Sequence, residues 1–289
     1  MIYALDTNIY CRGEIHMALP VALQLYSVRD DLTQDYAGTL KKVKDMGYDY
    51  VEFAGFHDKT AQEIKELIDA AGLKAISAHV PYDALMADME KVLADYKLVG
   101  CEYVAIPWLD QKVAPGGEDF NTVVDSIIQI GKAAKAVGLT LLYHNHDFEF
   151  RKVGDEYGLD VLYSTIPADL LATEIDTCWV HVAKLDPAEY VRKYKGRAPV
   201  VHLKDFTMGD NVTGNLYDLI GDDSTNVEES KDSFDFRPLG QGRQNIPAIL
   251  EASLYAGAKY VVVEQDRSTT CTPLEAVMAS RDYLKSLGW

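Results

Sequence analysis

Histidine residues in this sequence follow short apolar runs, at positions where a strand would end. LLYHNHDFEF contains His144 and His146, and PVVHLKDF contains His202. Because side chains alternate along a strand, His144 and His146 point to the same face. Imidazole binds metal ions and transfers protons near neutral pH, so this face is predicted to carry one of these functions.

Carboxylates end other apolar runs. TEIDTCWV contains Glu174 and Asp176, and VVVEQDRS brings Glu264 after three valines. A buried carboxylate needs a cation or hydrogen-bond donors, which makes Asp176 the stronger candidate ligand of its pair, with an N-cap as the alternative role. Glu52 after YDYV and His79 after KAISA repeat the pattern. Each of these could instead serve only as a salt-bridge or hydrogen-bond partner.

A mixed set of imidazoles and carboxylates without cysteine favours a divalent ion such as Mn, Co, Zn or Mg. Two imidazoles and two carboxylates also leave coordination positions open for substrate oxygens, and Mn is our first expectation. No GxGxxG follows the first predicted strand, and neither GxxxxGK[ST] nor GxSxG occurs. The sequence therefore does not support a dinucleotide site, a phosphate-binding loop or a hydrolase nucleophile elbow.

The elements that position these residues are repeated units in which a helical stretch stops at glycine and an apolar run follows. Examples are DMGYDYVEF, AAGLKAISAH, AVGLTLLYHNH and YAGAKYVVVE. Glycine accepts the left-handed conformation that ends a helix, and a strand buried on both faces is apolar throughout. Strands are predicted at 19–26, 49–54, 73–79, 102–107, 139–145, 170–175, 199–204 and 259–264. Helices are predicted at 33–46, 60–71, 84–99, 119–137, 156–165, 187–194, 246–256 and 273–287.

Eight alternating units predict an α/β fold of the (β/α)8 TIM-barrel type, in which the carboxyl ends of the strands form the catalytic rim. Thr33 and Thr60 are predicted N-caps, the latter with Glu63 at capping-box spacing, and Pro273 suits a first helical turn. Residues 19–289 are expected to form one barrel domain preceded by an extension at 1–18. A long loop at 207–239 is predicted to be an active-site lid, with a plain surface insertion as the alternative.

The composition of the chain limits the classes of molecule that it is expected to bind. The 289 residues are 48% hydrophobic, enough for a large core, and carry a formal net charge of −17, which opposes binding to nucleic acid. Four cysteines are scattered without a CxxC pair, as expected for reduced thiols. The start lacks the pattern of a signal peptide, and no segment reaches transmembrane length. We therefore expect a cytoplasmic protein without a membrane partner.

Several phrases together resemble the sugar phosphate isomerase/epimerase superfamily of xylose isomerase-like barrels, which includes inosose dehydratase, tagatose-3-epimerase-like enzymes and endonuclease IV. The matching phrases are LQLYSVRD, SAHVPY, YHNHDFEF, EIDTCW, VHLKDF, PLGQG and VVEQD, spread from about Leu19 to Trp289. The resemblance implies one divalent metal held by ligands on strands five to eight. Asp176, His202 and Glu264 match three of these ligands by position.

The fifth strand departs from the superfamily pattern, because many relatives read Glu-Asn-His where this chain has His144-Asn145-His146. Either His144 replaces the carboxylate ligand, which gives a predicted metal set of His144, Asp176, His202 and Glu264, or Glu149 turns back into the site. The endonuclease branch needs a further His where this chain has Trp179, and with the acidic charge this argues against DNA repair.

The resemblance implies an isomerase or epimerase that removes a proton beside the carbonyl of a keto-sugar, keto-cyclitol or sugar phosphate. A dehydratase or β-eliminating lyase acting on an oxidised (3-oxo) sugar or glycoside is one alternative, and a non-catalytic sugar-binding barrel is another. The partner would be a small-molecule carbohydrate, and a homo-oligomer is possible. The predicted catalytic residues are His146, Glu264 or Glu149 as base, and His79 or Lys204 at the substrate oxygen. The predicted substrate contacts are Glu52, Arg29, Trp108, Trp179 and Arg243.

Overall fold

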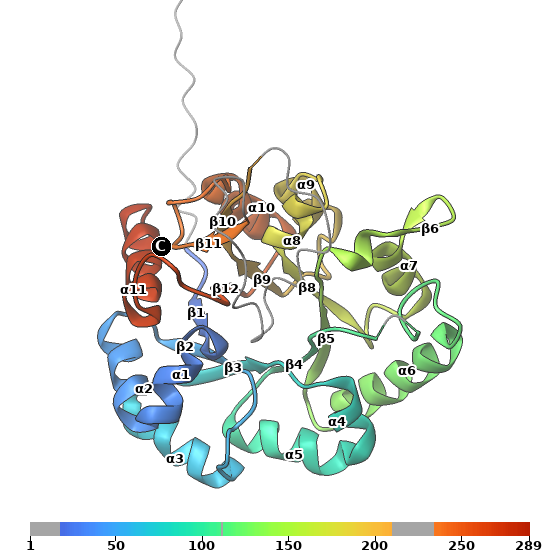
Figure 1. Cartoon of the computed structure of the whole chain (residues 1–289). Helices are drawn as coiled ribbons and strands as arrows, with labels where there is room; N and C mark the ends of the chain where they lie inside the picture. Colours follow the sequence, from blue (N-terminus) through green and yellow to red (C-terminus); the bar gives the residue numbers. More distant parts are fainter. Residues whose placement is uncertain (1–17, 111, 210–233) are drawn as a thin grey trace, which may run out of the picture.

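A computed structural model describes residues 18–110, 112–209 and 234–289. Eight parallel strands surround one axis, and helices cover the outside of the ring (Figure 1). This arrangement confirms the predicted (β/α)8 barrel. The barrel strands are β1 (Val21–Gln24), β2 (Tyr50–Phe53), β3 (Lys74–Ala78), β4 (Tyr103–Ile106), β5 (Thr140–His144), β8 (Ala172–Asp176), β9 (Val200–Leu203) and β12 (Tyr260–Val263).

The ring closes between β3 and β4. Along the sheet the strands run in the order β3-β2-β1-β12-β9-β8-β5-β4. The two end strands are joined by a parallel bridge between His79 and Ala105. The amide of Val80 donates to the carbonyl oxygen of Ala105 at 2.8 Å, and the amide of Glu102 donates to that of Ile76 at 2.8 Å. Closure therefore brings His79, directly after β3, to the same interior as the residues of β5 and β9.

Each of the eight predicted helices has a counterpart in the structure, but two of them are divided. The predicted helix 33–46 consists of α1 (Arg29–Gln34) and α2 (Tyr36–Asp45), and the predicted helix 84–99 consists of α4 (Tyr82–Ala87) and α5 (Met89–Val99). The other helices are η1 (Leu25–Val28), α3 (Ala61–Ala71), α6 (Phe120–Ala136), η2 (Phe148–Phe150), α7 (Gly158–Thr165), α8 (Thr177–Val182), α9 (Pro187–Lys193), α10 (Ile246–Ala256) and α11 (Pro273–Ser286).

Helix capping explains both the successes and the error at Thr33. Thr60 forms the predicted capping box with Glu63 at the start of α3, and Pro273 occupies the first turn of α11. Thr33, in contrast, lies inside α1, where its hydroxyl donates to the carbonyl oxygen of Arg29 at 2.9 Å. Asp35 caps α2 instead, because its extended backbone lets its carboxylate accept from the Gly38 amide.

The barrel interior is layered by the alternation of side chains along each strand. A small apolar cluster, separate from the main core between sheet and helices, contains Leu142, Ala172, Val200 and Val262. Two residues further along the same strands, the interior side chains are polar or charged: His144, Glu174, His202 and Glu264. Two residues further again, at or beyond the strand ends, stand His146, Asp176, Lys204 and Asp266. Along these strands, the interior side chains therefore change from apolar to polar or charged toward the rim.

Two antiparallel hairpins stand beyond this rim. One pairs β6 (Lys152–Val153) with β7 (Glu156–Tyr157), and the other pairs β10 (Asp205–Thr207) with β11 (Asp235–Arg237). The second hairpin joins the two ends of the loop predicted at 207–239. Residues 210–233, the greater part of the predicted lid, and residues 1–17 of the predicted extension lie outside the described residues.

Asp205 anchors the second hairpin to the turn before α10. Its Oδ1 accepts the amides of Phe206 and Gln244 at 2.9 and 3.0 Å, and its Oδ2 accepts those of Gly240 and Gly242, both at 3.0 Å. A Cβ on Gly242 would lie 2.1 Å from Asp205 Oδ1, so glycine is required there. This explains the Gly-rich turn in PLGQG as a structural feature.

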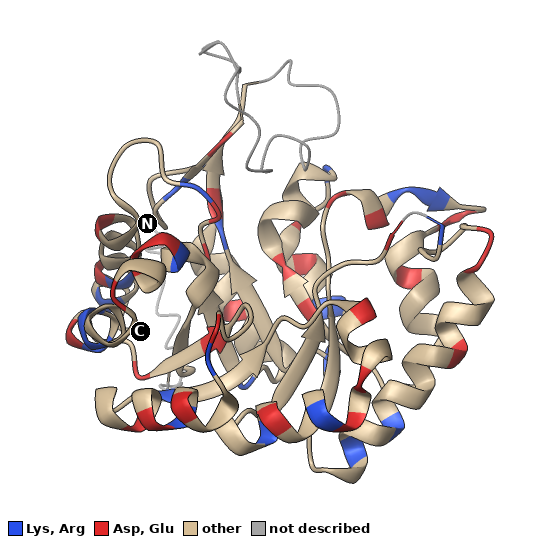
Figure 2. Cartoon of the chain, turned by 60° about the horizontal axis from the view of Figure 1, so that its bottom comes forward, with Lys and Arg blue, Asp and Glu red and all other residues tan. Residues whose placement is uncertain are grey.

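Charged side chains of both signs are interspersed over the outer helices, with further carboxylates inside the barrel (Figure 2). Within the described ranges, every helix is too short or too polar to cross a bilayer.

Gly131 in α6 faces the chain that leads into β8, and it generates a prediction. An added Cβ would lie 2.3 Å from the carbonyl oxygen of Leu170, which is backbone and cannot rotate away. We expect Gly131→Ala to destabilise the protein by about 1–3 kcal/mol through overpacking, although alanine is the better helix former. Urea unfolding measures the change, and Gln129→Ala, at an exposed position of the same helix, is the control. Stabilisation by Gly131→Ala would contradict the close contact.

Candidate metal centre and active site

A pocket of about 370 Å³ opens at the carboxyl ends of the barrel strands. It combines imidazoles, an ammonium and carboxylates with aromatic and proline side chains. The lining residues are Tyr26, Ala54, Gly55, His79, Pro81, Pro107, Trp108, His144, His146, Lys204, Glu264 and Asp266. Five of the predicted site residues with ionisable side chains therefore share one cavity.

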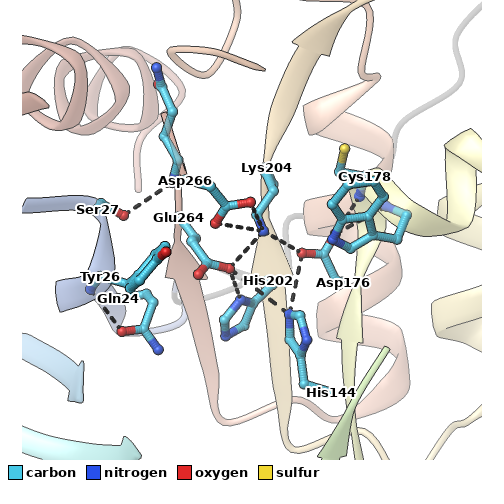
Figure 3. A network of polar contacts seen from close by, with 12 residues as sticks. Gln24, Tyr26, Ser27, His144, Asp176, Cys178, His202, Lys204, Glu264 and Asp266 are labelled. Atoms are coloured by element: carbon cyan, nitrogen blue, oxygen red, sulfur yellow. Dashed lines mark hydrogen bonds and ion pairs between the residues drawn. The ribbon is translucent and has the colours of Figure 1, made fainter. Parts of the chain in front are cut away.

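The four predicted metal ligands, His144, Asp176, His202 and Glu264, come together at the base of this pocket. Each offers a ligand atom within 4.8 Å of the other three, and all four side chains are buried. His202 Nδ1 lies 3.0 Å from Glu264 Oε2, and His144 Nε2 lies 3.3 Å from Asp176 Oδ2. Figure 3 shows these side chains converging from β5, β8, β9 and β12.

The donor atoms fit a cation. Asp176 uses Oδ1 to accept the amides of Cys178 and Trp179 at 2.8 and 3.1 Å, which leaves Oδ2 directed toward His144. Neither ring nitrogen of His144 has a hydrogen-bond partner within the described ranges. A buried imidazole left in this way beside a carboxylate oxygen is suited to metal coordination. Asp176 thus combines the ligand position with the N-cap role, since it also caps α8.

Lys204 crosses the same cluster with a fully buried ammonium. Its Nζ lies 3.2 Å from Asp176 Oδ2, 2.9 Å from Glu264 Oε2 and 3.0 Å from Asp266 Oδ2 (Figure 3). Burial raises the pKa of Asp266 to about 7, and Lys204 only partly offsets this. Although burial also raises the pKa of Asp176, Lys204 and His144 lower it to about 2. Three carboxylates face one ammonium, and a divalent ion would add positive charge where acidic groups are in excess.

A second network lies deeper in the barrel around the other nitrogen of His202. His202 Nε2 is 2.8 Å from Glu52 Oε1 and 3.1 Å from Glu174 Oε1, while His79 Nε2 is 2.6 Å from the same Glu174 oxygen. Gln24 donates from Nε2 to Glu52 Oε1 at 2.7 Å. These carboxylates orient His202 so that Nδ1 is directed toward the predicted ligands, which is the usual outer-shell arrangement of a metal-binding histidine.

Strand register explains which acid of β8 belongs to the upper cluster. Asp176 is level with His202 of β9, whereas Glu174 is level with Val200. Glu174 and Asp176 share one face of the strand, so alternation alone cannot separate them. The stagger of neighbouring strands therefore assigns Asp176 to the upper cluster, and Glu174 to the deeper network.

Glu149 is directed away from the four predicted metal ligands. Its Oε1 accepts the hydroxyl of Tyr143 at 2.6 Å and its Oε2 accepts the amide of His146 at 2.7 Å. The backbone of Tyr143 is fixed in turn, because the Tyr163 hydroxyl donates a hydrogen bond to the Tyr143 carbonyl oxygen at 2.8 Å. Of the two alternatives for the fifth strand, His144 has atoms within the ligand cluster, and Glu149 instead supports the turn that carries His146.

His146 lies beside the cluster and lines the pocket. Its ring centroid is 5.0 Å from that of His144 and 5.3 Å from that of Phe148, with which it stacks. Burial holds its pKa well below the usual range of histidine, and His144 and Lys204 add to this effect. The imidazole is therefore neutral at neutral pH.

The residues predicted to contact substrate lie at different distances from the pocket. Trp108 is 44% exposed and lines the pocket, as expected for a substrate-binding aromatic. Arg29 lies beside the pocket and donates to the carbonyl oxygens of Tyr26 and Asp266 at 3.1 and 2.8 Å. Arg243 is exposed and donates to the carbonyl oxygen of Met208 at 2.7 Å, outside the residues that line the pocket.

Trp179 and Glu52 are below the surface on which a substrate would lie. Trp179 is fully buried against Phe234 and Phe236, so its position differs from our expectation of a substrate contact. The reason is that the chain turns into α8 directly after β8 and carries Trp179 beneath the β10–β11 hairpin. Glu52 is likewise buried in the deeper network rather than at the pocket surface.

Sequence reasoning missed Gln24, the network role of Glu174, and Asp266 in the upper cluster. Gln24 ends β1 at the level of Glu52, and a polar residue closing the apolar run VALQ was an available signal. Asp266 stands two residues after Glu264, and continued alternation would have placed it on the same face.

Known proteins share this architecture. An inosose dehydratase from Clostridium perfringens is 24% identical over 231 residues, which cover 79% of this chain and 70% of that protein. The crystal structure of a sugar phosphate isomerase/epimerase from Parabacteroides distasonis superposes with a TM-score of 0.72 at 25% identity, covering 92% of this chain and 98% of that one. The structure of the IolI protein with a bound zinc atom, at 15% identity and a TM-score of 0.65, covers 94% of this chain and 98% of that one and shares the fold.

Residues 40–287 match the family described as xylose isomerase-like TIM barrel, which is most of the chain. Together with the closed eight-stranded barrel, this match shows that the chain belongs to the xylose isomerase-like TIM barrel family.

Proposed function

We propose that this protein is a divalent-metal-dependent isomerase or epimerase that removes a proton beside the carbonyl of a keto-sugar, keto-cyclitol or sugar phosphate. The observation that carries the proposal is the buried set of His144, Asp176, His202 and Glu264 at the base of a pocket that also contains His146. Relatives named as a dehydratase and as a sugar phosphate isomerase/epimerase support a small-molecule carbohydrate substrate.

The four ligands would hold the ion, and Mn remains our first expectation because mixed imidazole and carboxylate donors suit it. When bound, such an ion supplies Lewis-acid stabilisation of negative charge on substrate oxygens. Its charge would also balance the carboxylates Asp176, Glu264 and Asp266, which Lys204 alone does not neutralise.

His146 is our proposed general base. It lines the pocket without belonging to the ligand set, and a neutral imidazole has one nitrogen that accepts a proton. Stacking on Phe148 and the bond from its amide to Glu149 hold the ring in place, which a positioned base requires. Glu264 is a weaker candidate, because His202 and Lys204 already occupy its carboxylate.

Lys204 and His79 would assist at the substrate oxygen. Both line the pocket, and both hold a proton that a hydrogen bond can share with an oxygen. Although burial lowers the pKa of His79, Glu52 and Glu174 raise it above the usual range, and the same balance of burial against carboxylates raises that of Lys204. We assign Glu149 a positioning role, since both of its oxygens accept hydrogen bonds from the turn it supports.

A dehydratase or β-eliminating lyase is the second candidate function. A specific observation favours it: the pocket presents a proton acceptor, His146, and proton donors, Lys204 and His79, on one cavity surface. Elimination needs this combination, because a proton leaves one carbon and the departing oxygen on the next carbon must be protonated. The similarity to an inosose dehydratase points the same way.

Removal of the metal generates the first prediction on activity. We expect chelation to abolish exchange of solvent deuterium into a panel of keto-sugars, and added Mn to restore it. His202→Ala should lose both bound metal and exchange, because it removes the ligand that joins the two networks. Metal content is measured by mass spectrometry and exchange by NMR.

His57→Asn is the matched control for that histidine variant. His57 is exposed with φ of 53°, a left-handed conformation that asparagine tolerates. It should keep metal and exchange. Full exchange in the metal-free protein would contradict the metal proposal, and ligand binding without any exchange would favour a non-catalytic sugar-binding barrel.

Replacement of the proposed base separates proton transfer from metal binding. We expect His146→Gln to keep its metal and to lower kcat by about 10²- to 10⁴-fold, the usual contribution of a general base. Steady-state kinetics and metal content are measured on the same preparation. Unchanged kcat in a metal-loaded His146→Gln protein would remove His146 from this role.

Glu149 generates a prediction about stability and pH. Burial raises its pKa in the folded protein to about 7, from an ordinary value of 4.5. As pH rises from 4.5 to 7, the unfolded chain releases this proton first, so the fold loses stability across that window. We expect the wild type to lose up to about 3 kcal/mol more than Glu149→Gln between these pH values, and no extra amount below them.

Urea unfolding at several pH values measures this difference. Glutamine can keep both contacts, with its oxygen accepting the His146 amide and its nitrogen donating to Tyr143. Curves for the two proteins that stay parallel from pH 4.5 to 7 would show that Glu149 does not titrate in this window.

A further inference from the structure

The pocket has two chemically different walls, and each wall comes from a different set of strands. The charged wall follows β5, β9 and β12 and consists of His144, His146, Lys204, Glu264 and Asp266. The apolar wall follows β1 to β4 and consists of Tyr26, Ala54, Gly55, Pro81, Pro107 and Trp108. His79, directly after β3, is an ionisable residue on the side of the pocket where the apolar wall lies.

The pocket is large enough to hold more than the sugar ring that the charged wall would bind. About 370 Å³ lies within the range of roughly 300–1,000 Å³ in which proteins enclose ligands of drug size. A carbonyl-bearing sugar ring held by the charged wall has its hydroxyls next to the metal ligands, His146 and Lys204. The space along the apolar wall then remains for a second part of the same molecule.

The apolar wall offers flat, rigid surfaces, and among its described lining residues only Tyr26 and Trp108 carry a polar side-chain atom, a hydroxyl and an indole N–H. Trp108 is 44% exposed, although an indole this size is usually well covered in a folded protein. Pro81 and Pro107 have no backbone N–H, and among the described residues that line this wall none is Lys, Arg, Asp or Glu. A second sugar would bring hydroxyls that need partners, whereas an aromatic ring needs only apolar contact.

A phosphate group on this side would also lack a counter-charge. The guanidinium of Arg29, beside this wall, lines an adjoining pocket of about 130 Å³ instead of the larger one. It already donates to the carbonyl oxygens of Tyr26 and Asp266, and it covers the Tyr26 ring at 4.1 Å. Phosphate recognition normally uses an Arg or Lys that is available for bidentate or charge-assisted contact.

We propose that the substrate is an unphosphorylated keto-sugar glycoside whose aglycone is an uncharged aromatic ring, with the sugar on the charged wall and the aromatic ring on Trp108. The inference rests on the proposed function, since it names the substrate class of that same site. It goes further in making the wall after β1 to β4 the part that selects the substrate.

The test compares four ligands on the metal-loaded protein: the methyl, phenyl and glucosyl 3-oxo-glucosides, and 3-oxo-glucose 6-phosphate. Deuterium exchange into the sugar carbons gives kcat and KM, and calorimetry gives binding. We expect KM for the phenyl glycoside to be at least about tenfold below that for the methyl glycoside, because burial of the ring adds apolar contact. The glucosyl compound and the phosphate should show no such gain.

Variants at the apolar wall test the cause of that preference. Trp108→Ala should collapse the ratio of methyl to phenyl KM toward one, and Trp108→Phe should keep most of it. Tyr255→Ala is the matched control, because Tyr255 is 55% exposed on α10, outside the pocket. Its ratio should equal that of the wild type, and thermal melting confirms that each variant is folded.

The outcomes separate the two proposals. Exchange into the methyl glycoside without a phenyl preference, or a preference for the phosphate or the glucosyl compound, would overturn the aromatic aglycone and leave the proposed function standing. Tighter phenyl binding by calorimetry with no exchange into any ligand would uphold the aromatic site and overturn proton abstraction. A phenyl preference that survives Trp108→Ala would overturn the assignment of the ring to this wall.

Discussion

Burial of charge inside the barrel is the constraint on which the site depends. Asp176, Glu264 and Asp266 are removed from water together, and the ammonium of Lys204 reaches all three. Unpaired charges in such a place would cost several kcal/mol each, so every carboxylate must have a positive partner or a donor. This requirement is met for Asp176 by the backbone amides at the start of α8, which donate to its carboxylate. It is met for Glu264 by the neighbouring imidazoles of His144 and His202.

The alternation of side chains along each strand and the stagger between strands decide which charged groups meet. On β5, β8, β9 and β12, alternation gives an apolar residue at mid-barrel and a polar residue toward the rim, as Val200 and His202 illustrate. Stagger then decides which residues of neighbouring strands share a level, so that Asp176 meets His202. His202 is the link between levels, because one ring nitrogen is directed toward Glu264 and the other toward Glu52. Its orientation is therefore fixed from both sides.

Much of this arrangement was predictable from the sequence, because it depends on local rules. Apolar runs closed by His144, His202 and Glu264 predicted the eight strands, and the barrel confirmed them. The same three residues lie close together, as the prediction of a cluster at the rim requires. The remainder depends on long-range geometry. The stagger that separates Glu174 from Asp176, the chain direction that buries Trp179, and the inward turn of Glu149 are set by neighbouring strands and helices, which a linear pattern does not encode.

The carboxylate of Asp205 has a consequence for how this barrel tolerates change. It ties four backbone amides, one from β10 and three from the turn before α10, to one point, and β10 pairs with β11 from this residue onward. The chain between these paired strands therefore leaves and re-enters the barrel at neighbouring positions. Because both ends of this segment are held by the strand pairing and by Asp205, insertions or deletions between them need not displace Lys204, so this segment is a natural place for evolution, or for an engineer, to exchange one sequence for another.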